Sequence, residues 1–139
     1  MTTPILIWGA GAIGASLGAV LVRLGHDVLF VDNVPEHVQA INERGLEIVG
    51  PLVQTIVTAP AALPEQVTGQ FDRVFLCVKA LHTETATKAL APHLAPDGSV
   101  VSAQHGLNEL AIAKIIGRDR THGRFRHFAA PLPEPGLVP

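Results

Sequence analysis

The chain has 139 residues, of which 47 % are hydrophobic and 16 % are charged, and its formal net charge is -2 at pH 7. This length predicts a single domain, and the charge balance excludes the strongly basic face with which most proteins bind nucleic acids. The lone cysteine, Cys77, excludes an internal disulfide and indicates a reducing cytoplasm, and the longest apolar stretch, residues 12–22, is too short to span a membrane.

The first half of the chain alternates short apolar runs with helical periodicities. Ile5–Trp8 is an apolar run closed by glycines and is predicted to be a strand. Residues 12–24 carry their large apolar side chains at helical spacing, and Gly25 ends this predicted helix. Val28–Val31 is predicted to be a second strand, and Pro35–Arg44 a second helix.

The second half continues the alternation. Residues 74–78 are uniformly apolar, which is typical of a strand buried on both faces of a parallel sheet, and Asp97-Gly98 predicts a turn. The expected elements are two extended runs at Leu46–Val49 and 52–58, a loop or irregular helix over 59–69, a strand at 74–78, a helix at 83–94, a strand at 99–103 and a helix at 108–116 with Asn108 as its N-cap.

Strands that alternate with helices predict an α/β fold of the Rossmann type, a doubly wound parallel sheet with helices on both faces. We expect this domain over residues 1–130 and a proline-rich tail over residues 131–139. An arginine cluster near their junction is either an anion site or, as we favour, a solvated face or an incomplete strand. Its members are Arg118, Arg120, Arg124 and Arg126.

The most informative motif is Gly9-Ala10-Gly11-Ala12-Ile13-Gly14, a G-x-G-x-x-G sequence between a predicted strand and a predicted helix. In that context the motif predicts dinucleotide binding by these six residues. The first glycine allows the tight turn, the second lets the backbone approach a pyrophosphate, and the third lets the helix pack closely on the sheet. Free N–H groups at the helix start would hold the anion. The alternative is a glycine-rich turn without a ligand.

Asp32 follows the second predicted strand, eighteen positions after Gly14. An acidic side chain at this place accepts hydrogen bonds from the adenosine ribose of a dinucleotide. Its carboxylate would repel a 2′-phosphate, and like charges in contact cost several kcal/mol. Asp32 therefore favours NAD(H) over NADP(H). The alternative role is to cap the turn after the strand.

Polar side chains follow two further predicted strands, at the sheet edge where doubly wound folds bind their ligands. Lys79 comes directly after residues 74–78 and is predicted to contact the nicotinamide end of the cofactor. His105 and Asn108 follow the next strand and are predicted to contact cofactor and substrate, with a general-acid role for His105 as the less favoured alternative. Each of the three has the alternative of an ordinary surface or strand-end residue. No histidine shows metal-ligand spacing, so no metal site is predicted.

Three segments together resemble the N-terminal domain of the ketopantoate reductase (2-dehydropantoate 2-reductase) family. They are Ile5 to Gly14 with Gly25-His26-Asp27-Val28 after it, then Leu76-Cys77-Val78-Lys79-Ala80, and Ser102-Ala103-Gln104-His105-Gly106-Leu107-Asn108-Glu109. The resemblance covers about residues 4 to 130. It implies an enzyme that reduces ketopantoate to pantoate with NADPH, on the path to pantothenate and coenzyme A. It also implies that Gly9 to Gly14 hold the pyrophosphate and that Lys79 contacts the cofactor and lies near the substrate.

The sequence departs from the family pattern at three points. His105 stands where the family has an asparagine that contacts cofactor and substrate, and Asp32 stands where NADPH-using members tend to carry a basic or neutral residue. The family's proton-donating lysine lies in a helical C-terminal domain, which we expect to be absent because the sequence ends at Pro139. We therefore expect a chain that binds a dinucleotide, turns over the 2-keto acid poorly or not at all, and forms a homo-oligomer through the apolar face left bare.

Two other functions compete with this interpretation. A regulatory NAD-binding module, like those that gate potassium uptake, has a similar length, the same glycine motif and a strand-end aspartate, and it resembles residues 33–45. Such a module does not account for Val78-Lys79-Ala80 or Gln104-His105-Gly106. A methyltransferase also pairs a glycine loop with a strand-end acid, but its loop usually has a different spacing.

Overall fold

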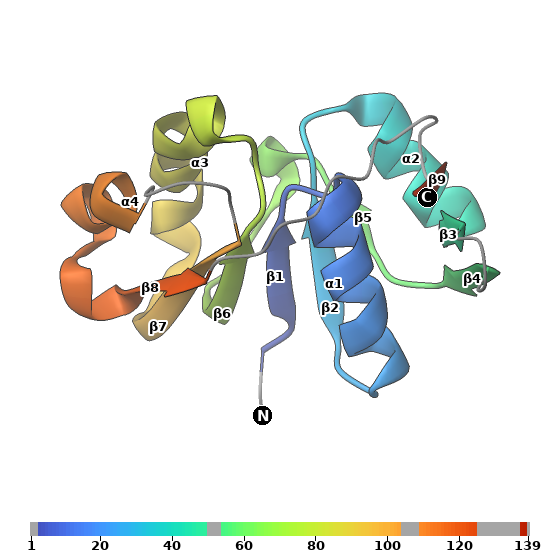
Figure 1. Ribbon diagram of the computed structural model, residues 1–139, viewed down its shortest axis with the longest axis horizontal. Coiled ribbons are helices and arrows are strands. Elements are labelled where there is room, and N and C mark those ends of the chain that lie inside the picture. Colours follow the sequence, from blue (N-terminus) through green and yellow to red (C-terminus); the bar gives the residue numbers. More distant parts are fainter. Residues whose placement is uncertain (1–2, 50–53, 104–108, 125–136, 139) are drawn as a thin grey trace.

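A computed structural model of the chain describes residues 3–49, 54–103, 109–124 and 137–138. Six parallel strands form the main sheet in the order β5-β2-β1-β6-β7-β8, and helices cover both of its faces (Figure 1). The predicted doubly wound α/β fold is confirmed. The sheet strands are β1 (Ile5–Trp8), β2 (Val28–Val31), β5 (Ala61–Ala62), β6 (Phe71–Leu76), β7 (Leu94–Ala103) and β8 (Thr121–Arg124), and the helices are α1 (Ala12–Arg23), α2 (Pro35–Arg44), α3 (Thr83–Leu90) and α4 (Glu109–Ile116).

The side chains of β1 alternate between two apolar cores, one on each face of the sheet. Ile5 and Ile7 pack with residues of α1 and α2, whereas Leu6 and Trp8 pack with residues of α3 and α4. All four side chains are buried. Because successive strand residues face opposite sides, an apolar residue at every position of β1 indicates a central strand with helices above and below it.

Helix α1 packs closely on the sheet because the side that it buries carries only small residues, Gly14, Ala15, Gly18 and Ala19. A Cβ atom at Gly18 would overlap the aromatic ring of Phe30 in β2. This close approach holds the first turn of α1 against the carboxyl ends of the strands. In the described ranges no helix has both the length and the apolarity that crossing a bilayer requires.

Strand β1 lies between β2 and β6, so the chain leaves β1 toward one side of the sheet and returns on the other. Such a reversal opens a crevice beyond the carboxyl ends of the two central strands, where doubly wound folds bind ligands. The backbone ties the crevice together, since Gly9 N–H donates to the Val31 carbonyl at 2.7 Å and Cys77 N–H donates to the Trp8 carbonyl at 2.8 Å.

A second, three-stranded sheet lies beside α1 and α2. Its members are β3 (Leu46–Val49), β4 (Gln54–Val57) and β9 (Leu137–Val138), in the order β4-β3-β9. Strand β3 pairs antiparallel with β4 and parallel with β9. Of the predicted tail over residues 131–139, only Leu137 and Val138 fall within the described ranges, where they form β9.

Several element boundaries differ from the predicted ones. The helix predicted over 83–94 ends at Leu90 and continues as a 3-10 turn, Ala91–His93, because Pro92 lacks the N–H group that a longer helix needs. Strand β7 starts at Leu94 instead of 99, and the predicted Asp97-Gly98 turn lies inside it, where its register with β6 shifts. Strand β6 covers Phe71–Leu76 instead of 74–78.

Long-range contacts explain two of these differences. Asp72 and Arg73 are charged, so the sequence does not indicate that β6 starts before them. In the structure both side chains stay exposed, and the Arg73 guanidinium donates to the Thr3 carbonyl at 3.1 Å. Arg120 of the arginine cluster donates to the carbonyl of Ala95 at 2.7 Å, which holds the irregular start of β7. Thr121–Arg124 form strand β8, which pairs with β7. In the cluster, Arg124 therefore belongs to a strand and Arg120 makes a structural contact.

Candidate functional site

Two glycines of the loop after β1 are required by the fold itself. Gly9 has a φ of 103°, in the left-handed region that favours glycine. A Cβ atom there would also lie 2.9 Å from the carbonyl carbon and oxygen of Cys77. A Cβ atom at Gly14 would overlap the carbonyl oxygen of Gly9. The packing of the loop on itself and on the segment after β6 therefore explains both residues.

Gly11 is not explained in this way. Its φ of -78° and ψ of -158° are extended values that other residues adopt. Among the described residues, apart from its two chain neighbours, nothing lies within 4 Å of a Cβ atom built there, and Gly11 lines a pocket. The folded chain therefore has room for a larger residue at position 11, whereas a ligand in contact with the backbone would not leave that room.

Backbone N–H groups at the start of α1 are available to a ligand. Within the described residues, the N–H groups of Gly11, Ala12, Ile13 and Gly14 donate no hydrogen bond. The first turn of α1 contains no acidic side chain. Because the unpaired N–H groups of a helix start carry partial positive charge, this end of α1 attracts an anion.

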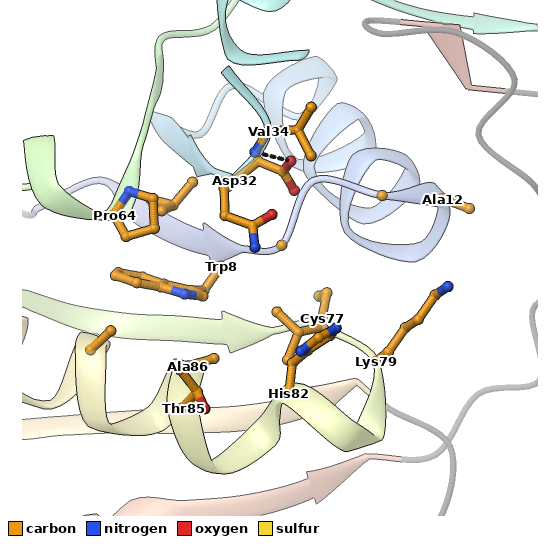
Figure 2. Close-up of a pocket in the computed structure, with 16 residues that line it drawn as sticks. Trp8, Ala12, Asp32, Val34, Pro64, Cys77, Lys79, His82, Thr85 and Ala86 are labelled. Carbon is orange, nitrogen blue, oxygen red and sulfur yellow. Dashed lines mark hydrogen bonds between the residues drawn. The ribbon is translucent and has the colours of Figure 1, made fainter. Parts of the chain in front are cut away.

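Asp32 connects the glycine loop with the turn after β2. Its Oδ1 accepts the Ala10 N–H at 3.1 Å, and its Oδ2 accepts the Val34 N–H at 3.2 Å, the bond drawn in Figure 2. The second bond is the turn-capping role that the sequence left open. Each carboxylate oxygen has two lone pairs, and Asp32 lines the pocket, so both oxygens keep capacity for a ligand hydroxyl.

A pocket of about 830 Å³ opens beyond the ends of β1 and β6. This volume lies within the roughly 300–1,000 Å³ of typical small-molecule sites. Figure 2 shows Trp8 and Pro64 at one end of the pocket and Ala12 and Lys79 at the other, with Asp32 between them. The pocket therefore has an apolar end, an acidic middle and a basic end.

The structure brings together residues from three of the predicted segments. Those that line the pocket are Gly9, Gly11, Ala12, Asp32 and Lys79. The other residues of the motif, Ala10, Ile13 and Gly14, belong to the loop and the first turn of α1. The predicted contacts of His105 and Asn108 lie outside the described residues.

Three parts of the pocket wall were missed by sequence analysis. Trp8 is only 4 % exposed and was predicted simply as a strand residue, although its place directly before Gly9 could have marked it. His82 and the α3 positions Thr85 and Ala86 also line the pocket. The sequence hardly indicates a role in the pocket for these residues. They reach the pocket wall only because α3 packs on β6 in the folded chain. Among the described residues, no cluster of side chains has the composition of a metal site.

Cys77 lines the pocket, yet burial among apolar groups raises the pKa of its thiol to about 12. The thiolate is the reactive form, and this pKa lowers its fraction at pH 8 about 1,000-fold, of which the greater nucleophilicity of a more basic thiolate offsets about 10-fold. We therefore expect iodoacetamide at pH 8 to alkylate the folded chain about 100-fold more slowly than the urea-unfolded chain. Mass spectrometry of the modified cysteine gives both rates. Similar rates in the two states would show that the thiol ionises normally in the folded protein.

Comparison with known proteins gives concordant matches. Residues 5–138 match the family model described as ketopantoate reductase PanE/ApbA. The 2-dehydropantoate 2-reductase of Pyrococcus abyssi is 38 % identical over 140 residues, and that of Halobacterium salinarum is 33 % identical over 138 residues. Each alignment covers 96 % of this chain but only 43 % and 45 % of those proteins, respectively. The chain thus spans less than half the length of these relatives.

Solved structures show the same relationship. The ternary structure of D-mandelate dehydrogenase with NADH and anilino(oxo)acetate has a TM-score of 0.91 at 29 % identity, and 2-dehydropantoate 2-reductase from Geobacter metallireducens has a TM-score of 0.88 at 29 % identity. Each match covers 98 % of this chain and 45 % of the other. Because a family model matches nearly the whole sequence and relatives exceed 30 % identity, the chain belongs to the ketopantoate reductase PanE/ApbA family.

Proposed function

We propose that this chain binds NAD(P)H in the pocket beyond β1 and β6 and forms the cofactor-binding part of a reductase. That reductase would transfer a hydride from the cofactor to a 2-keto acid such as 2-dehydropantoate. The observation that carries the proposal is Gly11, a glycine that the folded chain does not require and that lines the pocket beside free N–H groups. The names of the relatives, and the NADH in the D-mandelate dehydrogenase structure, support this class of reaction.

The pocket offers a suitable contact for each part of a dinucleotide. The free N–H groups from Gly11 to Gly14 suit the pyrophosphate. The Asp32 carboxylate suits the adenosine ribose hydroxyls, and in this arrangement the adenine would lie toward the apolar end with Trp8 and Pro64. Lys79 at the other end then lies near the nicotinamide and the keto acid.

We also propose that these 139 residues alone bind the cofactor but reduce the keto acid poorly or not at all. The resemblance assigns the proton-donating lysine of the family to a helical domain distinct from the glycine-loop domain. Hydride transfer to a ketone produces an alkoxide, which needs a positioned proton donor. The relatives' names favour this interpretation over a regulatory NAD-binding module without catalysis.

Calorimetric titration with NADH and with NADPH tests the proposal directly. We expect NADH to bind about 10-fold or more tightly than NADPH, because the Asp32 carboxylate repels a 2′-phosphate. Among the described lining residues Asp32 is the sole carboxylate and no arginine is present. Asp32→Asn removes the charge at nearly constant volume and is expected to bring the two Kd values close together.

The outcomes separate the parts of this proposal. Binding of neither cofactor by a folded chain would contradict the proposed function. Tighter binding of NADPH would keep that function but make Asp32 a residue of the turn. The melting temperature of Asp32→Asn is the control for stability. Asp32 accepts two backbone hydrogen bonds, one at each carboxylate oxygen, and the NH2 group of asparagine cannot accept one of them.

A further inference from the structure

His37 is a buried histidine on α2 that is not part of the pocket wall. It is 1 % exposed, and its Nε2 lies 2.6 Å from the carbonyl oxygen of Ala10, between the first two glycines of the loop. Because a carbonyl oxygen only accepts hydrogen bonds, Nε2 carries the proton and donates it. The imidazole therefore holds the glycine loop from a helix that lies 27 residues further along the chain.

Ala10 is held on both sides of its backbone. Its N–H donates to Oδ1 of Asp32 at 3.1 Å, and its carbonyl accepts from His37. These two groups belong to the peptide planes before and after Ala10, so each plane is fixed by one side chain. Both side chains come from the segment that begins at the end of β2 and continues into α2.

The bond from His37 also affects the free N–H groups. No described peptide bond is cis, so the N–H of Gly11 points opposite to the Ala10 carbonyl and away from His37. Gly14 N–H would donate to the same Ala10 carbonyl if α1 began one residue earlier. Among the described residues that bond is not formed. The contact thus fixes the orientation of the Ala10–Gly11 peptide, and with it the direction in which the Gly11 N–H points.

We propose that His37 is a positioning residue for the pyrophosphate of the cofactor, acting through the Ala10–Gly11 peptide. This inference rests on the proposed NAD(P)H binding and assigns part of its affinity to a residue that never touches the ligand. A loop already fixed in its binding conformation loses less entropy when the ligand arrives. Loss of His37 should therefore weaken ligands that carry the pyrophosphate and leave adenosine, which has none, nearly unaffected.

The test measures the Kd values of NADH and adenosine by fluorescence quenching. Trp8 is the only tryptophan, the chain has no tyrosine, and Trp8 lines the pocket, so the signal comes from the site itself. His37→Leu removes the donor and is expected to raise the Kd of NADH about 10-fold while that of adenosine stays within about 2-fold. His37→Gln, whose amide Nε2 can donate in the same place, should restore most of the NADH affinity.

A matched variant separates positioning from stability. Val38→Ala removes a buried side chain from the neighbouring position of α2 and should lower the melting temperature without changing the ratio of the two Kd values. Equal weakening of NADH and adenosine in His37→Leu would make the role of His37 purely structural and overturn the inference. An unchanged NADH Kd in that variant would overturn it as well. Failure of the unmodified chain to bind either NADH or NADPH would instead overturn the proposed function, and the inference with it.

Discussion

Gly11→Ala is expected to weaken NADH binding by about 2–3 kcal/mol, roughly 30- to 150-fold in Kd, because the new methyl group occupies the place of the pyrophosphate. In the part of the chain that the structure describes, no atom beyond the two neighbouring residues lies within 4 Å of that methyl group, and the φ of Gly11 suits alanine. Alanine gains up to about 1 kcal/mol by restricting the unfolded chain and loses about 0.5–1 kcal/mol relative to glycine at a helix N-cap. The free energy of unfolding should therefore stay within about 1 kcal/mol of its original value.

Titration calorimetry and urea unfolding, carried out on the same preparation, measure the two quantities. A loss of binding without a loss of stability would assign the glycine to the ligand. If Gly11→Ala bound NADH as tightly as the unmodified chain, no phosphate would approach this backbone. The open space at Gly11 would then no longer support the proposed function. Ser16→Ala, a methyl-sized change on the same helix, provides the control for nonspecific effects.

Gly14→Ala is expected to have the opposite result, a loss of about 3 kcal/mol or more in the free energy of unfolding. A Cβ atom at this position overlaps the Gly9 carbonyl oxygen, and Cys77 lies only 3.1 Å away on another side. The loop and α1 would have to move apart. Helix propensity acts in the other direction, since alanine exceeds glycine by about 1 kcal/mol inside a helix. The sign of the change therefore decides whether close packing or local propensity dominates.

The shift in the urea midpoint measures this effect, and a loss of that size lowers the melting temperature by about 10 °C for a domain of this length. A stability equal to or above that of the unmodified chain would show that the loop relaxes freely around the methyl group. Together, the two variants apply the same chemical change three residues apart. The helical position favours alanine at Gly14 and not at the N-cap Gly11, so a loss of stability at Gly14 alone would come from its contacts. Opposite results would therefore separate the glycine needed for the fold from the one needed for a ligand.

Local sequence patterns were sufficient to predict the glycine loop and the order of the helices and most strands, but they did not predict β5, β8 or β9. The run Ile5–Trp8, the small residues of α1 and the glycine motif each act over a few neighbouring positions, and periodicity reports such features directly. Element ends were less predictable where distant residues decide them. Asp72 and Arg73 lie in β6 although their charge favours a loop, because the contacts of Thr3 and the pairing with β7 outweigh that preference.

The sequence by itself determined the fold class, the glycine loop and the acid at the end of β2, because chain spacing and side-chain type suffice to recognise them. Only the tertiary structure decided that Trp8 lines the pocket, that His37 is buried against Ala10 and that Gly11 has open space around it. Helical spacing from Ile41 puts His37 on the buried side of α2, but no sequence pattern indicates that its imidazole contacts the Ala10 carbonyl. The physical reason is that burial, the partner of a hydrogen bond and the space beside a glycine depend on residues brought together by the crossing of β1, α1 and α2, and no local pattern encodes those distances.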